Sequence, residues 1–225
     1  MIKIKKLSKT YLAGKANQVE ALKNVSLNID KGEMIALTGP SGSGKSTLLH
    51  ILALMDTQTS GEYFLMGKNV KDMSEKECAD SRNRKIGMIL QDYGLIEELT
   101  ALQNVQLPLI IAGENGKRAK KKTITALETV GLEKQIKQSV NRLSGGQRQR
   151  VAIARAMVTD AQIILADEPT GALDKIATNE FMALMTKMNE KGATIIIATH
   201  NEAVAKLCKR RIYINDGIVS EQEEM

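Results

Sequence analysis

Apolar and polar residues alternate over three stretches in the first third of the chain. These stretches are residues 1–7 (MIKIKKL), 19–29 (VEALKNVSLNI) and 61–67 (GEYFLMG). Successive side chains of a β-strand point to opposite faces, so alternation is typical of strands with one buried and one solvated face. We therefore predict half-buried antiparallel strands at these three places.

Short, continuously apolar runs form a second pattern. They lie at 33–39 (EMIALTG), 86–90 (IGMIL), 161–166 (AQIILA) and 193–199 (ATIIIAT). Strands covered on both faces by helices have this composition. Because helical patterns separate the runs, they predict an α/β core of mainly parallel strands joined by crossover helices.

Helical spacing is visible at residues 45–55 (KSTLLHILALM) and 181–188 (FMALMTKM). The methionine-rich stripe of the second segment indicates core packing and not a cofactor site. The stretch from about 92 to 160 interrupts the alternation of strands and helices, so we predict a mainly helical subdomain inserted in the α/β core of one domain, residues 1–225.

The end of the chain predicts a hairpin. Residues 213–221 (YINDGIVSE) turn at Asp216-Gly217, a pair that favours the tight turn between two strands. The last residues, 220–225, are expected to be frayed.

Composition excludes several classes of function. The chain of 225 residues has 3% aromatic residues and no Trp, which disfavours base stacking on an aromatic platform. Its net charge of +6 is moderate. The run GKRAKKKT is typical of a solvated helix face. Two isolated cysteines and two histidines exclude a disulfide framework and a His-rich metal cluster. With no run near the ~20 apolar residues of a membrane span, we expect a cytoplasmic chain that reaches a membrane only through another polypeptide.

The segment GPSGSGKST, residues 39–47, matches the pattern G-x-x-x-x-G-K-[ST] between a predicted strand and a predicted helix. Its glycines let backbone N–H groups close around phosphate oxygens, Lys45 reaches the outer phosphates, and the Ser46 hydroxyl can bind Mg²⁺. The alternative is a glycine turn beside a surface lysine. The full pattern favours a nucleotide-binding loop made of Gly39, Pro40, Ser41, Gly42, Ser43, Gly44, Lys45, Ser46 and Thr47.

Polar residues follow three of the predicted buried strands. Asp167 is expected to hold magnesium through water, and Glu168 to orient and deprotonate the water that attacks a phosphate. His200 is expected to contact the γ-phosphate or that water, and Gln91 the metal or water. An acidic pair or a lone histidine is often structural, but the carboxyl ends of parallel strands are where ligands of such sheets bind.

A second glycine-rich turn opens a helix at NRLSGGQRQRVAIARAM, residues 141–157. A helix N-terminus with free N–H groups favours an anion. Ser144 and Gln147 have the spacing of a capping box, which is the structural alternative. It leaves Gly145 and Gly146 unexplained, because glycine destabilises a helix.

In this order, the motifs resemble those of the ATP-binding cassette (ABC) ATPases, and the resemblance covers essentially the whole chain. It implies ATP hydrolysis with ATP and Mg²⁺, on a P-loop (RecA-like) core with an N-terminal antiparallel β subdomain and an inserted helical subdomain. Tyr11 fits the aromatic residue that stacks on adenine, and Gln91 fits the Q-loop. Residues 143–147 (LSGGQ) fit the family signature, and Asp174 ends the D-loop GALD. Residues 89–113 and 167–174 look like those of macrolide exporters, lipoprotein-release systems and bacteriocin exporters.

The resemblance also implies partners. In similar proteins two cassettes pack head to tail, and the signature of each, here Ser144, Gly145, Gly146 and Gln147, covers the γ-phosphate held by the other. A homodimer or cassette heterodimer closed by ATP would then drive a separate transmembrane permease at the cytoplasmic face of the membrane. The cargo expected is a peptide, antimicrobial or lipoprotein-like substrate, exported or released.

Two rival functions remain. Cassettes that handle nucleic acids typically carry a long coiled coil between the motifs or two cassettes in tandem. Here Gly44 and Ser144 are only 100 residues apart and no heptads intervene, so no nucleic acid is expected. A regulatory cassette that binds ATP without turnover is the other rival, and Glu168 and His200 argue against it.

Overall fold

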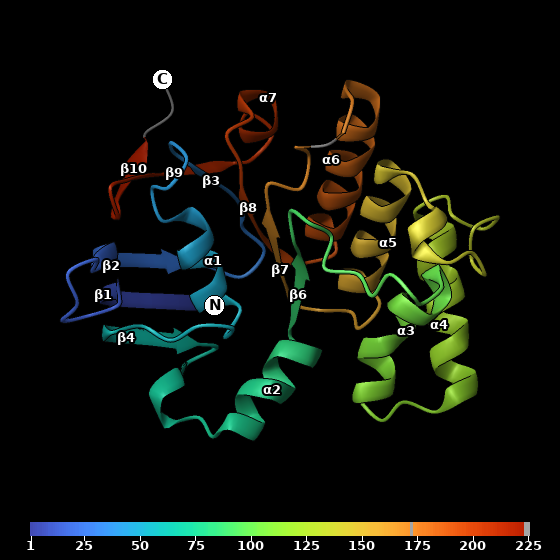
Figure 1. Cartoon of the computed structure of the whole chain (residues 1–225), viewed down its shortest axis with the longest axis horizontal. Helices are drawn as coiled ribbons and strands as arrows, with labels where there is room; N and C mark the ends of the chain where they lie inside the picture. The colour runs from blue at the N-terminus through green and yellow to red at the C-terminus, as the bar shows by residue number, and fades with distance from the viewer. Residues whose placement is uncertain (172, 223–225) are drawn as a thin grey trace.

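Two β-sheets and the helices around them make up the fold (Figure 1). The computed structural model describes residues 1–171 and 173–222. Ala172 of the expected D-loop, and residues 223–225 of the tail expected to be frayed, lie outside the described residues.

The N-terminal sheet is antiparallel, as predicted. Its strands pair in the order β2-β1-β4-β5. Every second or third side chain of β1, including Ile2, Ile4 and Leu7, is buried, which is the half-buried pattern read from the sequence. The strands are β1 (Ile2–Tyr11), β2 (Val19–Ile29), β4 (Ser60–Leu65) and β5 (Lys68–Asn69).

The second sheet is mainly parallel. Its order is β10-β9-β3-β8-β7-β6, with parallel pairing from β9 to β6 and an antiparallel β10 at one edge. The four predicted buried strands are all present. The strands are β3 (Met34–Thr38), β6 (Ile86–Ile89), β7 (Ile163–Asp167), β8 (Thr194–Ala198), β9 (Arg210–Asn215) and β10 (Ile218–Gln222).

The C-terminal hairpin turns where the sequence predicted. Asp216 and Gly217 have φ of 46° and 77°, as a two-residue turn between strands requires. The prediction that the chain frays from 220 onward is wrong for residues 220–222, because they pair with β9 from Tyr213 to Arg211.

Seven helices occur among the described residues. Helix α1 ends three residues before the predicted limit of 55, because Leu54 takes a left-handed conformation with φ of 58°. The helices are α1 (Lys45–Leu52), α2 (Glu75–Arg84), α3 (Ala101–Ile111), α4 (Gly116–Thr129), α5 (Gly145–Met157), α6 (Lys175–Glu190) and α7 (Glu202–Ala205), with short 3₁₀ turns at Val70–Asp72 and Val140–Arg142.

The core has two halves, one on each face of the second sheet. Met34 and Ala36 of β3 pack with α3, α4, α5 and α6, whereas Ile35 and Leu37 pack with α1 and the antiparallel sheet. Figure 1 shows α1 and α5 on opposite sides of β6 and β7. The two glycine-rich helix starts therefore lie on opposite sides of the sheet.

The region from 92 to 160 is helical. All of its residues are described, and none belongs to a strand. That this region is a subdomain of a single domain stays a prediction. In the described ranges, 1–171 and 173–222, no helix combines the length and apolar character that crossing a bilayer requires.

Candidate functional site

A cleft of about 820 Å³ lies beyond the carboxyl ends of β3, β6, β7 and β8. Its volume suits a nucleotide-sized ligand. The structure gathers most of the predicted site residues here from segments far apart in the chain. Those lining the cleft are Tyr11, Ser41, Gly42, Gly44, Lys45, Ser46, Thr47, Gln91, Asp167, Glu168 and His200.

The loop between β3 and α1 needs glycine at two of its positions. Gly39 and Gly44 have φ of 141° and 108°. A Cβ on Gly39 would lie 2.0 Å from the Ile214 carbonyl oxygen, and one on Gly44 would lie 2.5 Å from that of Ala21. Side chains are therefore excluded by both conformation and space, and the loop presents its backbone to the cleft.

Lys45 is the first residue of α1, and its ammonium group lies inside the loop. Nζ donates to the carbonyl oxygens of Gly39 and Pro40 at 2.9 and 2.8 Å. The first N–H groups of α1 have no partner within the helix, and no side chain caps them. A cation beside free N–H groups is an anion site. The buried Ser43 Oγ has no partner among the described residues, which fits a loop that takes a ligand's oxygens.

Asp167, the last residue of β7, supplies a carboxylate at the floor of the cleft. It is buried, and its Oδ1 has no hydrogen-bond partner among the described residues. The Ser46 hydroxyl and the Gln91 amide line the same cleft. Mg²⁺ is commonly held by one or two protein oxygens together with substrate phosphates. The described part of the chain contains no group of three or more His, Cys, Asp or Glu residues arranged to hold a metal ion by themselves, so phosphates and water would complete such a site.

Glu168 and His200 form a pair across the ends of β7 and β8. His200 Nδ1 lies 2.9 Å from Glu168 Oε1, and the His200 backbone N–H donates to Oε2 at 3.4 Å. Glu168 has a left-handed φ of 44°, and its backbone N–H donates to the Ala198 carbonyl. Such strained backbone clusters at functional sites. The carboxylate side chain is 14% exposed and the imidazole 73%, so the imidazole is accessible to solvent and to a ligand in the cleft.

The second glycine-rich turn lies outside this cleft. Ser144 Oγ accepts from the Gln147 N–H at 3.3 Å, and Gln147 Oε1 accepts from the Ser144 N–H at 3.0 Å, which confirms the capping box. Gly145 and Gly146 follow, and none of these four residues lines the cleft. Asp174 caps α6 by accepting from the Ala177 N–H at 2.8 Å and also lies outside the cleft. Within one chain the two glycine-rich helix starts are therefore separate.

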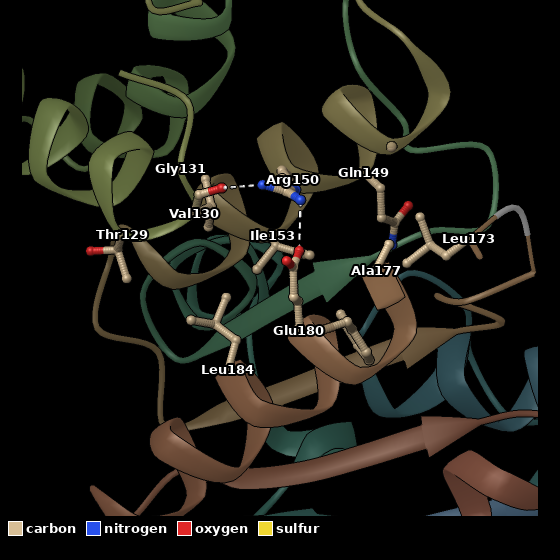
Figure 2. A pocket seen from close by; sticks show the side chains of 12 residues that line it. Thr129, Val130, Gly131, Gln149, Arg150, Ile153, Leu173, Ala177, Glu180 and Leu184 are labelled. Carbon is tan, nitrogen blue, oxygen red and sulfur yellow. Dashed lines mark hydrogen bonds and ion pairs between the residues drawn. The ribbon is translucent and has the colours of Figure 1, made fainter. Parts of the chain in front are cut away.

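Helix α5 is held against its neighbours beside a second, smaller cavity of about 260 Å³ (Figure 2). Arg150 donates to the Val130 carbonyl after α4 and pairs with Glu180 of α6 at 2.6 Å. Gly146 and Leu173 line this cavity from the start of α5 and the segment before α6. The start of α5 and the segment that follows Glu168 therefore line one cavity.

Sequence reasoning missed the other wall of the cleft. Its residues come from the start of β2 and from the β9–β10 hairpin, which meet at the loop. The Gly217 N–H donates to the Ser43 carbonyl, and the Gly217 carbonyl accepts from the Lys23 N–H. The sequence predicted the Asp-Gly turn, but it did not indicate that this turn packs against the loop between β3 and α1. The missed residues are Val19, Glu20, Ala21, Lys23, Asp216 and Gly217.

Comparison with known proteins gives consistent relatives. The sequence profile of the family described as ABC transporter matches residues 22–171. The chain is 43% identical over 225 residues to "Macrolide export ATP-binding/permease protein MacB" of Bdellovibrio bacteriovorus, covering all of this chain and 34% of that protein. It is 44% identical over 230 residues to "Uncharacterized ABC transporter ATP-binding protein MJ0796" of Methanocaldococcus jannaschii, covering all of this chain and 97% of that one. The chain thus spans about a third of the length of the MacB relative.

A solved structure shares the fold over the full length. It is described as "Dimeric structure of a post-hydrolysis state of the ATP-binding cassette MJ0796 bound to ADP and Pi". The TM-score is 0.92 at 41% identity, and the match covers 100% of both chains. A second structure, "Dimeric Structure of MJ0796, a Bacterial ABC Transporter Cassette", also matches with a TM-score of 0.92, at 42% identity over 100% of both chains.

Proposed function

The chain belongs to the ABC transporter family as an ATP-binding subunit with ATPase activity that uses ATP and Mg²⁺, and from that premise we propose that two cassettes close on ATP to drive a separate membrane permease. The proposal includes the roles of individual residues, the shared sites, the membrane partner and the class of cargo.

The hydrolytic step follows from the groups in the cleft. The loop N–H groups and the Lys45 ammonium bind the outer phosphates and stabilise the charge that develops on them. Glu168 accepts a proton from the attacking water, whose oxygen bonds to the γ-phosphorus as the bond to the β-phosphate oxygen breaks. His200 holds that water or the γ-phosphate. Mg²⁺ held by Ser46, by Gln91 and, through water, by Asp167 would neutralise phosphate charge.

The position of the signature, residues 143–147, is the observation that supports the proposed dimer. Ser144 and Gly145 are exposed at the start of α5 and lie outside their own chain's cleft. The free N–H groups of such a helix N-terminus favour an anion. Because Ser144 and Gly145 lie outside the cleft of their own chain, that anion has to come from another molecule. We propose that a second cassette presents the γ-phosphate, with Gly146, Gln147 and Asp174 beside it. The dimers described for MJ0796 support this arrangement.

Closure and hydrolysis are then coupled. ATP bound by one chain bridges to the signature of the other, so binding favours the closed dimer. Loss of the γ-phosphate removes the bridging anion and favours opening. We propose that residues 1–225 act as one ATPase domain and that the helical region from 92 to 160 transmits this motion.

We propose that the chain lies at the cytoplasmic face of the membrane, where it binds a separate transmembrane permease. The chain's likeness to a protein named as a macrolide export ATP-binding/permease protein supports export. Two exposed apolar side chains near the end of α3, Ile110 and Ile111, offer a contact surface in the helical region. We propose a peptide, antimicrobial or lipoprotein-like cargo, and no nucleic acid.

The dimer is tested by the mass of the chain with and without nucleotide. The Glu168→Gln chain is measured by size exclusion with light scattering. We expect 24.6 kDa without ATP and twice that mass with ATP and Mg²⁺. ADP in place of ATP is the control and should leave the mass unchanged. A chain that binds ATP and stays at the lower mass at every protein concentration would contradict the proposal.

A further inference from the structure

The ring of Tyr11 is held in place by two side chains outside the recognised motifs. Tyr11 is the last residue of β1 and lines the cleft. Its hydroxyl donates to Asp56 Oδ2 at 2.8 Å. The ammonium of Lys9, two residues earlier on the same strand, lies 4.7 Å from the centre of the ring. This distance is typical of a cation–π contact.

Lys9 is buried, and the groups around it stabilise its positive charge. The residue is 9% exposed. Nζ donates to Asp56 Oδ1 at 2.6 Å and to the Thr57 carbonyl at 2.7 Å. A buried ammonium group is unfavourable unless it is paired and hydrogen-bonded, and here the carboxylate, the carbonyl and the ring share that role.

Asp56 joins this cluster to the helix that begins in the phosphate loop. Burial alone would raise the pKa of Asp56, but hydrogen bonds from Lys9 and Tyr11 hold it below its ordinary value. Its backbone N–H donates to the His50 carbonyl of α1. Helix α1 has 8 residues, which corresponds to a length of about 12 Å. The cluster therefore fixes the ring relative to Lys45 at the other end of α1.

We infer that Lys9 and Asp56 are positioning residues that hold the Tyr11 ring with one face against the ammonium and leave the ring's cleft side for the nucleotide base. This rests on the proposed role of Tyr11. Lys9 itself is not among the described residues that line the cleft, so it acts on the base only through the ring. A ring ordered before binding does not have to be ordered by the nucleotide, which favours affinity.

The test separates affinity from turnover. In the Lys9→Met chain, we expect Kd and KM for ATP to rise by about two- to tenfold, the usual cost of ordering one side chain. We expect kcat at saturating ATP to stay close to that of the unmodified chain, because the phosphate end is untouched. Asp56→Asn keeps the shape and removes the charge, and it should shift KM in the same direction. Thermal unfolding confirms that each variant is folded.

The chain offers a matched control on the same strand. Lys5 lies 5.1 Å from the centre of the Phe64 ring and 3.4 Å from Glu62 Oε2, and none of the three lines the cleft. Lys5→Met also removes a cation from a ring, so it should leave Kd and KM unchanged.

Two further measurements distinguish positioning from a general loss of structure. Inorganic tripolyphosphate has no base, so its Kd should be the same for Lys9→Met and the unmodified chain. In a Tyr11→Ala background, Lys9→Met should add no further loss of ATP affinity. The inference would be overturned if Lys9→Met weakened the binding of ATP and of tripolyphosphate equally. It would also be overturned if Lys9→Met lowered ATP affinity as much in the Tyr11→Ala background as in the unmodified chain.

Failure of the inference is distinguishable from failure of the proposed role of Tyr11. If Tyr11→Ala leaves the Kd for ATP unchanged, the ring does not bind the base and both fail. If Tyr11→Ala weakens ATP binding while Lys9→Met and Asp56→Asn do not, the ring binds the base without their help. The inference alone then fails.

Discussion

Replacement of Glu168 by Gln isolates one property of the cleft, the ability to accept a proton. Gln keeps the volume of the side chain and an oxygen that can accept from the His200 N–H. The loop around Lys45 and the Asp167 carboxylate are unchanged. General-base catalysis typically contributes 10²–10⁴ in rate, so we expect kcat to fall by about that factor, or roughly 3–5 kcal/mol in the barrier.

Stability should change little. The Glu168–His200 pair involves an imidazole that is 73% exposed, and exposed ion pairs contribute at most about 1 kcal/mol. The melting temperature should therefore move by less than about 4 °C. If activity is lost while the melting temperature stays the same, the substitution has affected the catalytic step and not the fold.

The assay is phosphate release at saturating ATP and Mg²⁺, with Kd for ATP measured on the same protein. Glu20 provides the matched control, because it is another carboxylate that lines the cleft but stands on β2, away from the ends of β7 and β8. Glu20→Gln should keep kcat within about twofold, since no catalytic role is assigned to it. Phosphate release by Glu168→Gln at the unmodified rate would refute the assignment, and Asp167 would become the next candidate base.

Three further changes test other parts of the account. Lys45→Ala removes the cation from the phosphate loop and should lower ATP turnover at least about 10²-fold; turnover within tenfold of the unmodified chain would exclude the assigned role. A Cβ on Gly87 of β6 would lie 2.3 Å from the Ala156 carbonyl of α5, so Gly87→Ala should cost about 1–3 kcal/mol and lower the melting temperature by roughly 3–10 °C; unchanged melting would show that α5 does not rest on this strand. Burial raises the pKa of the Cys208 thiol to about 11, so at pH 8 iodoacetamide should modify partly exposed Cys78 much faster than Cys208; equal rates by mass spectrometry would contradict the burial of Cys208.

The parts of the fold that the sequence predicted are those governed by local spacing. Continuous apolar runs identify β3, β6, β7 and β8, because strands covered on both faces have no polar side. The residues that follow three of these strands, Gln91, Glu168 and His200, then fall at one edge of the sheet without knowledge of strand order. The phosphate loop can be recognised from the sequence because its glycines and Lys45 follow a fixed spacing.

Other features depend on contacts between distant segments. Lys9 and Asp56 are 47 residues apart, and nothing in the local pattern of either indicates that they meet. The wall of the cleft formed by β2 and the C-terminal hairpin likewise depends on contacts between segments that are far apart in the sequence. Helix α2 was overlooked because only Ser81 is buried along it, so it has no apolar stripe. Its capping box, Ser74 with Glu77, was the signal that could have found it.

The central claim is that each ATP is held by two chains, and a mixture of two inactive variants tests it most directly. Ser144→Arg places a bulky cation at the start of α5, outside its own cleft, so that chain should bind ATP but neither dimerise nor hydrolyse it. Lys45→Ala is inactive through its own loop. In the mixed dimer, one site joins the intact loop of the first chain to the intact signature of the second. An equal mixture should recover part of the phosphate release, up to about half of that of the unmodified chain if only mixed dimers close and each intact site works alone. No recovery, together with loss of ATP binding by the Ser144→Arg monomer, would place the signature in its own chain's site and contradict the account.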